Sequence, residues 1–293
     1  SGIQRLQIFW KHKLENLEIQ NNRISSVSIN GEIHNPEIVI MAIGNAARDT
    51  FEMLSHTTAM ESKPFAVGFR IEHPQDFINE TFYGNQNDFS ISGPATYRLT
   101  AKALNRGVYS FCMCPGGQII GASSEKNSVV TNGMSSSGRN GKFANSAILA
   151  SVNEKDYGNG ILAGMKFQRK IEEKCFDLKY PYFAPFQTAK DFMKSIPTKR
   201  KMESSYNPGV FSSDLNSIYP SAIANAIKTC MKVFEKRTNG FIDKGIFLAP
   251  ETRTSSPVRI LRNNKDFTSQ SHSNLFPCGE GSGYAGGIMS SAA

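Results

Sequence analysis

The stretch Asn274-Leu-Phe-Pro-Cys-Gly-Glu-Gly-Ser-Gly-Tyr-Ala-Gly-Gly-Ile-Met-Ser-Ser-Ala292 predicts a short strand, a glycine-dense turn with one carboxylate, and the first turns of a helix. Its glycines, at positions 279, 281, 283, 286 and 287, leave backbone N–H groups uncovered by side chains. Phosphate, ribityl or ring-carbonyl oxygens can therefore approach the N-terminus of that helix directly. The stretch is typical of a nucleotide-cofactor site.

Within it, Gly281-x-Gly283-x-x-Gly286 matches the dinucleotide fingerprint. That fingerprint normally opens a βαβ unit and needs an acidic residue about 20 positions later to bind the ribose. Seven residues follow Gly286, so we do not expect an ordinary Rossmann start here. A glycine-rich surface loop is the alternative. The strand-like Leu275-Phe276 before the turn and the apolar Ile288-Met289 after it favour a cofactor motif.

Four separated stretches resemble the uncharacterised FAD-dependent dehydrogenases, a branch of the two-dinucleotide-binding-domain flavoproteins. They are VIMAIGNAARDT at 39–50, RGVYSFCMCPGG at 106–117, ETRTSSPVR at 251–259 and PCGEGSGYAGGIMSSAA at 277–293. They occur in the order that the family has and extend over nearly the whole chain. Members of the family begin with an FAD-binding Rossmann segment, and none precedes Ser1. We therefore expect the C-terminal portion of a longer flavoprotein.

The resemblance implies an α/β fold of mixed α+β character. Residues 1–60 are expected to supply a β-meander and a return strand of an incomplete FAD-binding domain. Residues 61–262 would form an inserted, β-rich α+β substrate domain, and 263–293 would return as the final strand and truncated helix of the FAD domain. We expect residues 1–60 to pack against 263–293.

The resemblance also implies FAD as cofactor and hydride transfer through the flavin to or from a small-molecule substrate, with NAD(P)H as a candidate partner. Glu280 takes the position where many relatives have an aspartate that meets the ribityl chain. The helix that begins near Gly286 would point its N-terminus at the flavin ring. The residues expected to bind the cofactor are Ala42, Ile43, Gly44, Gly279, Glu280, Gly281, Gly286, Gly287 and Ile288.

Arg253 and Arg259 bracket several hydroxyl residues and are predicted to bind a carboxylate or phosphate of the substrate. A salt-bridged connector between domains is the alternative. The residues identify no catalytic acid or base. For the isolated chain we expect no turnover, and a non-catalytic small-molecule-binding domain of a larger flavoprotein is the alternative function.

Composition limits the other classes of protein. The 293 residues are 39% apolar, which is enough for one large or two ordinary packed domains. Lys and Arg total 33 against 25 acidic residues, giving a net charge of +8 and a pI near 9.2. These positive charges are scattered, so we expect a solvated surface rather than a nucleic-acid-binding one. No apolar run is long enough for a membrane helix, and we expect a soluble, cytoplasmic protein without a membrane partner.

Five cysteines and five histidines show no metal-ligand spacing, so no metal site is expected. The odd cysteine count indicates a reducing compartment. Cys112 and Cys114 lie two apart in a predicted strand and would face the same side. Buried thiols are the favoured interpretation and a redox pair is the alternative, because neighbouring same-face positions on a strand make poor disulfides.

The periodicity predicts a series of elements. A three-stranded meander is expected over 17–19, 23–29 and 37–42, a half-buried strand over 65–71, and a hairpin of 108–114 with 118–123 around Pro115-Gly116-Gly117. The helices are expected from Arg48 through Leu54, over 161–178 and over 220–237. Further strands are expected over 147–152 and 246–249, and a loop over 131–142.

Overall fold

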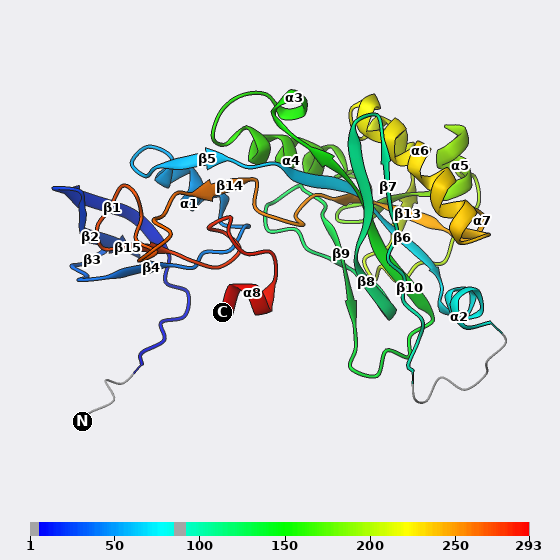
Figure 1. Cartoon of the computed structure of the whole chain (residues 1–293), viewed down its shortest axis with the longest axis horizontal. Helices are drawn as coiled ribbons and strands as arrows, with labels where there is room; N and C mark the ends of the chain where they lie inside the picture. The colour runs from blue at the N-terminus through cyan, green and yellow to red at the C-terminus, as the bar shows by residue number, and fades with distance from the viewer. Residues whose placement is uncertain (1–5, 85–91, 293) are drawn as a thin grey trace. The chain divides into compact units, whose positions relative to one another are not determined.

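The computed structural model describes residues 6–84 and 92–292 and divides into two compact units. The first comprises the chain up to Lys63, residues 160–162 and the chain from Ser255 onward; the second comprises Pro64–Asn159 and Ala163–Thr254. The sequence placed the corresponding boundaries after residues 60 and 262. The two units contain several sheets and helices, with more strands than helices among the described residues (Figure 1), which confirms the mixed α/β class.

The first unit is built from short sheets. Strands β1 (Leu14–Gln20), β2 (Arg23–Ile29) and β3 (Glu32–His34) form an antiparallel meander. The third strand of this meander is therefore 32–34, and the expected strand over 37–42 is β4 (Val39–Met41), which leaves the meander. β4 pairs in parallel with β15 (Leu275–Pro277). The helix α1 (Arg48–Leu54) forms as predicted, and β5 (Met60–Ser62) pairs with β14 (Val258–Ile260).

The buried side chain of Asn274 joins the meander to the β4–β15 pair. Its Oδ1 accepts a hydrogen bond from the backbone N–H of Ile24 at 2.9 Å, and its Nδ2 donates to the carbonyls of Ile24 at 3.0 Å and Glu37 at 3.3 Å. A buried backbone group without a partner costs about 1–3 kcal/mol. Asn274 thus provides hydrogen-bond partners for backbone groups of Ile24 and Glu37 that the meander and the β4–β15 pair leave without a strand partner.

The second unit centres on an eight-stranded sheet with the order β12-β11-β13-β6-β10-β8-β7, to which β9 adds by pairing with β8. All pairs are antiparallel except β11 with β12. The strands are β6 (Phe65–Pro74), β7 (Thr100–Ala103), β8 (Arg106–Gly121), β9 (Thr131–Ser135), β10 (Phe143–Val152), β11 (Ala184–Thr188), β12 (Val210–Ser212) and β13 (Ile246–Glu251).

The central strand β6 is buried on both faces, whereas its alternation predicted a half-buried strand. One face carries Phe65, Val67, Phe69 and Ile71. The other face carries small residues and Arg70, which is also fully buried. The alternation therefore reflects two different packed layers rather than one packed and one solvated face.

The predicted hairpin at Pro115-Gly116-Gly117 is wrong, because β8 continues through these three residues as one strand. β8 stays paired with β10 along this stretch. Two irregularities in the register accommodate one extra residue each in β8. The expected loop over 131–142 begins as strand β9 for five residues and becomes a loop only after Ser135.

Helix α6 (Ser221–Arg237) contacts β7, β8 and β10, and α5 (Ala189–Lys194) and α7 (Phe241–Lys244) lie beside it on the same side of the sheet (Figure 1). α4 (Ala163–Lys174) confirms the helix predicted over 161–178, in shorter form. The core contains an aromatic cluster in which the ring of Phe69 lies 5.2 Å from Phe192 and 5.3 Å from Phe247. The remaining helical elements are α2 (Gln75–Tyr83), α3 (Glu154–Tyr157), the 3₁₀ turn Leu215–Ser217 and α8 (Ile288–Ala292).

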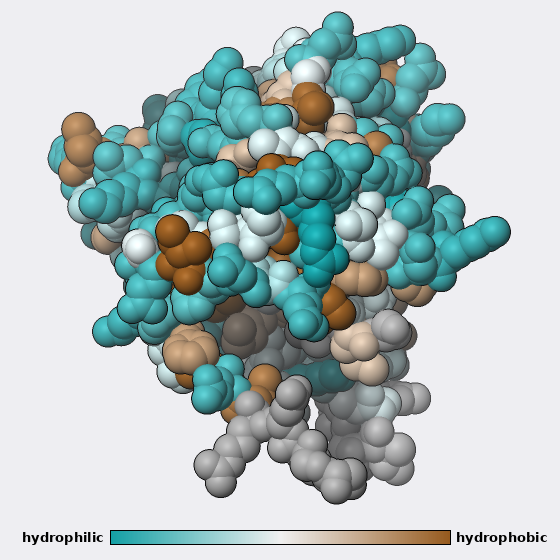
Figure 2. Space-filling model, turned by 90° about the vertical axis from the view of Figure 1, so that its left-hand side faces the viewer, coloured by the Kyte–Doolittle hydropathy of each residue, from teal (hydrophilic) through white to brown (hydrophobic). Residues whose placement is uncertain are grey.

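The face shown in Figure 2 is mainly hydrophilic, with hydrophobic side chains scattered among polar ones. Single hydrophobic side chains scattered in this way are normal on a protein surface. A search of the described helices for an apolar segment that could span a bilayer found none. The described residues also contain no cluster of three or more His, Cys, Asp or Glu side chains that could hold a metal ion.

Candidate functional site

The glycine-dense turn follows β15 directly and is closed by its own hydrogen bonds. Ser282 Oγ donates to the Gly279 carbonyl at 2.7 Å, and the Gly283 N–H donates to the Glu280 carbonyl at 3.0 Å. Gly279 and Gly283 have φ angles of +72° and +85°, a region that favours glycine. A side chain on Gly283 would also meet the carbonyl oxygen of Val258 at 2.6 Å. The turn therefore needs glycine at both positions.

The structure brings this turn against the end of β4, where the second set of predicted cofactor residues lies. The Cys278 N–H donates to the Met41 carbonyl at 3.0 Å and extends the parallel pairing. A Cβ atom on Gly281 would lie 2.3 Å from the Gly44 carbonyl oxygen. Because no residue with a side chain fits there, Gly281 and Gly44 form one close backbone contact between two segments that are more than 200 positions apart.

Glu280 faces Asn45 across this contact. Asn45 Nδ2 donates to Glu280 Oε1 at 2.9 Å. Burial raises the pKa of the Glu280 carboxyl, while the Asn45 hydrogen bond and the charge of Lys63 oppose that rise. Burial, together with the nearby Arg259, lowers the pKa of Lys63. The turn thus carries a partly buried carboxyl group that binds a proton more readily than a solvated one.

A cavity of about 350 Å³ lies beside the turn and is lined by Cys278, Gly279, Tyr284 and Arg262, among others. The guanidinium of Arg262 lies 4.3 Å from the centre of the Tyr284 ring and donates to the Pro277 carbonyl at 2.7 Å. Such contacts hold both side chains in place at the cavity wall.

The other predicted cofactor residues flank these contacts. Ala42 is exposed, Ile43 and Gly44 are half-buried, and Gly286 is exposed. The Gly286 N–H already donates to Ser290 Oγ at 3.3 Å. The following helix α8 begins at Ile288. The assignment of these residues to cofactor binding stays a prediction.

Arg253 and Arg259 each pair with a carboxylate and fall in different units. Arg253 Nη2 lies 2.7 Å from Glu172 Oε2, whose side chain is fully buried. Arg259 Nη1 lies 2.6 Å from Glu61 Oε1. Ion pairing is the alternative that the sequence left open, and substrate binding by either residue stays a prediction.

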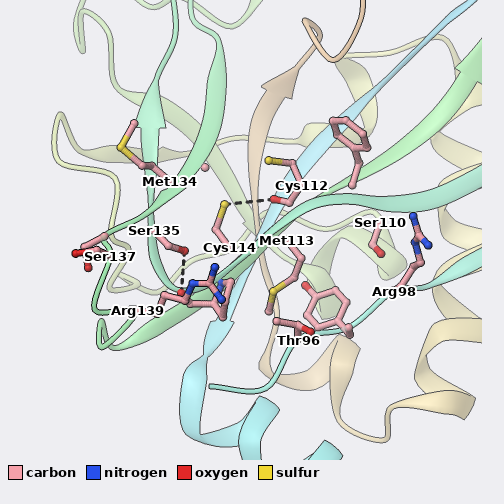
Figure 3. Close-up of a pocket in the computed structure, with 15 residues that line it drawn as sticks. Thr96, Arg98, Ser110, Cys112, Met113, Cys114, Met134, Ser135, Ser137 and Arg139 are labelled. Atoms are coloured by element: carbon pink, nitrogen blue, oxygen red, sulfur yellow. Dashed lines mark hydrogen bonds between the residues drawn. The ribbon is translucent and has the colours of Figure 1, made fainter. Parts of the chain in front are cut away.

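The sequence did not predict a larger cavity in the second unit, of about 790 Å³. It is lined by both Cys112 and Cys114 (Figure 3), and both of these residues accept hydrogen bonds from the buried Arg70. Cys114 is buried as expected, but Cys112 is exposed, so the interpretation of two buried thiols is wrong for Cys112. The Cys-x-Cys spacing was the signal in the sequence that could have pointed to this cavity. The irregularity of β8 that gives Cys112 and Cys114 different exposure cannot be read from the sequence.

Comparison with known proteins gives the family. The family described as "FAD-dependent protein, C-terminal domain-like" matches residues 64–254, which span the second unit. An uncharacterized protein of Clostridium beijerinckii is 41% identical over 300 residues, covering 99% of this chain and 56% of that protein. The present chain therefore spans about half the length of this relative.

Two crystal structures of CtdE were also found, one in complex with FAD and one with FAD and substrate 4. Their TM-scores are 0.31 and 0.30 at 7% and 8% identity; both cover 92% of this chain, and the match covers 48% and 44% of those chains. A likeness this low carries no argument about function.

The family match defines the class of protein. The chain belongs to the family of FAD-dependent proteins, and FAD is confirmed as the family's cofactor.

Proposed function

We propose that the chain is part of an FAD-dependent oxidoreductase, a dehydrogenase that transfers a hydride between a small-molecule substrate and the flavin. The observation that carries this proposal is the close contact of Gly281 with Gly44, where a Cβ would lie 2.3 Å from a backbone oxygen. Glycine at position 281 lets the turn approach the backbone of Gly44, and glycine-rich turns recur where a backbone approaches a nucleotide cofactor.

The residues present fit FAD. A Cβ built on Gly44, Gly279 or Gly286 meets no atom within 4 Å, so the backbone there is open to a ligand. Glu280, held by Asn45 at 2.9 Å, can exchange hydrogen bonds with a ribityl hydroxyl. Ala42 and Ile43 would flank the cofactor just after β4, and Gly287 and Ile288 would flank it where α8 begins. FAD, when bound, supplies the ring that accepts or gives the hydride.

The second unit would supply the substrate site. Its cavity of about 790 Å³ is within the usual range for small-molecule pockets. NAD(P)H is our proposed partner for the other half-reaction. The same cavity also favours the second candidate function, a small-molecule-binding domain without turnover of its own.

The test is calorimetric titration with FAD of the chain joined to the part of its relative that the match does not cover. We expect the Glu280→Gln variant to bind FAD about tenfold more weakly, because it loses a hydrogen-bonding carboxyl. The matched control is Glu37→Gln, which changes an exposed glutamate and should leave FAD affinity unchanged. Failure of the extended protein to bind FAD would refute the proposal; equal affinities for the two variants would remove Glu280 from the site.

A further inference from the structure

The cavity of the second unit lies where one edge of β8 has no strand partner. β7 pairs with β8 as far as Tyr109, and β9 pairs with it only from Gly117. Between them, residues 111–115 have no strand on this edge in the described part of the chain. The cavity opens there, with Cys112 and Cys114 on its wall and Arg98 and Arg139 among its other lining residues (Figure 3).

Two irregularities of β8 give the two thiols different surroundings. Opposite Asn145 and Ala147 of β10, two steps apart, β8 places Cys114 and Phe111, three steps apart. A second extra residue lies between Cys114 and Gly117, which face Asn145 and Phe143. These are β-bulges, which re-aim side chains and are frequent beside active sites. Cys112 takes a φ of +46°, a conformation that a residue with a side chain adopts at an energetic cost.

The buried side chain of Arg70 lies next to both cysteines. Its Nη2 donates to the Cys112 carbonyl at 2.6 Å and to Cys114 Sγ at 3.3 Å. Its Nε donates to Asn145 Oδ1 at 2.7 Å. A Cβ on Gly133 would lie 1.8 Å from Nη2, so glycine at this position makes room for the guanidinium. A fixed positive charge thus lies against the sulfur of Cys114 and the backbone of Cys112.

The groups around the two cysteines favour the thiolate form of Cys112. The side chain of Cys114 and the nearby charge of Arg70 lower the pKa of Cys112 to about 6, although burial opposes this shift. Burial raises the pKa of Glu251, the ion-pair partner of Arg70, to about 7 against the opposing charge of Arg70. A thiolate is the nucleophilic form of cysteine.

We propose that Cys112 and Cys114 form a redox-active dithiol that reduces small anionic disulfides bound in this cavity. The substrate's charge follows from the lining: Arg98 and Arg139 are exposed, and none of the lining residues is acidic. Cys112 and Cys114 do not lie on a regular strand, because the bulges interrupt the register of β8 between Phe111 and Gly117. The Cys114 side chain turns back toward Cys112, with Sγ 3.3 Å from the Cys112 carbonyl (Figure 3).

The reaction has two steps. The Cys112 thiolate attacks one sulfur of the disulfide R–S–S–R, the S–S bond breaks, and one RS⁻ leaves while a mixed disulfide forms on Cys112. Cys114 then loses its proton to solvent and attacks the Cys112 sulfur, releasing the second RS⁻. The pair is oxidised by two electrons to a Cys112–Cys114 disulfide, and the substrate is reduced to two thiolates. The disulfide would occupy the cavity that the proposed function gives to the flavin's substrate, but the thiol chemistry itself needs no flavin.

The first experiment counts released thiolates. The probe is dithiobis(nitrobenzoate), an aromatic disulfide with two carboxylates, and the background is Cys278→Ser, because Cys278 is partly exposed whereas Cys175 and Cys230 are buried. We expect the background protein to release two thiolates per chain and to show the Cys112–Cys114 disulfide by peptide mass mapping. Adding Cys114→Ser should give one thiolate and a stable adduct on Cys112. Adding Cys112→Ser should abolish the fast release.

A second measurement tests charge and pH. Replacing the exposed Arg98 and Arg139 by Gln should slow the anionic probe about tenfold, the scale of electrostatic steering, and leave the uncharged probe dithiodipyridine unaffected. The rate for Cys112 should reach half its maximum near pH 6. One thiolate released by the background protein with an adduct left on Cys112 would overturn the dithiol. Equal slowing of both probes would overturn the anionic substrate.

Discussion

Arg70 shows how one residue can decide the character of a site. It is fully buried in the central strand, where an unpaired charge would be strongly unfavourable. Asn145, Glu251 and the Cys112 carbonyl accept its hydrogen bonds. These partners come from three other strands, so the guanidinium fixes their relative positions as well as the electrostatics of the cavity.

Gly133 is the residue that makes this arrangement possible, and we expect Gly133→Ala to be costly. The new methyl group would lie 1.8 Å from Arg70 Nη2 and 2.3 Å from Asn145 Oδ1, and those two side chains hold each other in place. Overpacking of this kind destabilises a protein by about 1–3 kcal/mol. Urea denaturation measures the loss. The control is Gly138→Ala, where the nearest atom is 3.4 Å away; equal stability of the two variants would contradict the packing argument.

His73 should make stability depend on pH. It is fully buried, with Nε2 2.8 Å from the Phe241 carbonyl. Burial lowers its pKa from 6.5 to about 4, against the opposing hydrogen bond. The unfolded chain therefore binds a proton between pH 6.5 and 4 that the folded chain excludes, and His73 contributes stability above pH 6.5 that is lost as the pH falls through about 4. The loss is on the order of 3 kcal/mol.

The measurement is the difference in unfolding free energy between wild type and His73→Gln from pH 7.5 to 4. The difference is needed because the raised pKa of Glu251 acts in the opposite direction, adding stability at low pH that is lost as the pH rises through about 7. Wild type should lose stability relative to the variant on acidification. A difference that stays constant over this range would show that His73 is not held neutral.

At the scale of elements, Asn274 connects strands that do not pair with each other. We expect Asn274→Ala to destabilise the first unit by about 3 kcal/mol, because it leaves the buried N–H and carbonyl of Ile24 without partners. Urea denaturation followed by circular dichroism measures this cost. Asn263→Ala makes the same change at an exposed site, where only the bond to Thr268 is lost, and should be near neutral. A similar small effect at both sites would mean that water replaces the Asn274 contacts.

The elements also show what the sequence could predict. Amphipathic helices and apolar strands were identified because their signals are local, as in α1 and α6. The glycine turn and Gly44 were both singled out, and the structure places them in contact. The course of β8 was not predictable, because Pro115-Gly116-Gly117 has local turn chemistry and only the ladder with β10 keeps the strand going. The environment of Arg70 likewise depends on residues from distant strands.

At the scale of the whole molecule, the chain has two separately packed interiors. The main aromatic core lies in the second unit, whereas Phe51 and Leu54 are buried in the first. Phe69 is fully buried, and its ring lies 5.1 Å from that of Tyr219. Removing such a ring costs about 3–5 kcal/mol. The cost should be felt only by the segments that share its interior.

We therefore expect Phe69→Ala to accelerate amide hydrogen exchange in β6, β11 and β13 while leaving β1 and β2 unchanged, since exchange reports the stability of each cooperative unit. Phe51→Ala, which removes a buried ring from the first unit, should give the reverse pattern. Together the two variants separate a local loss of contacts from a global loss of stability. Accelerated exchange throughout the chain in both variants would mean that the two units unfold as one, and that the cofactor turn and the thiol cavity share a single stability.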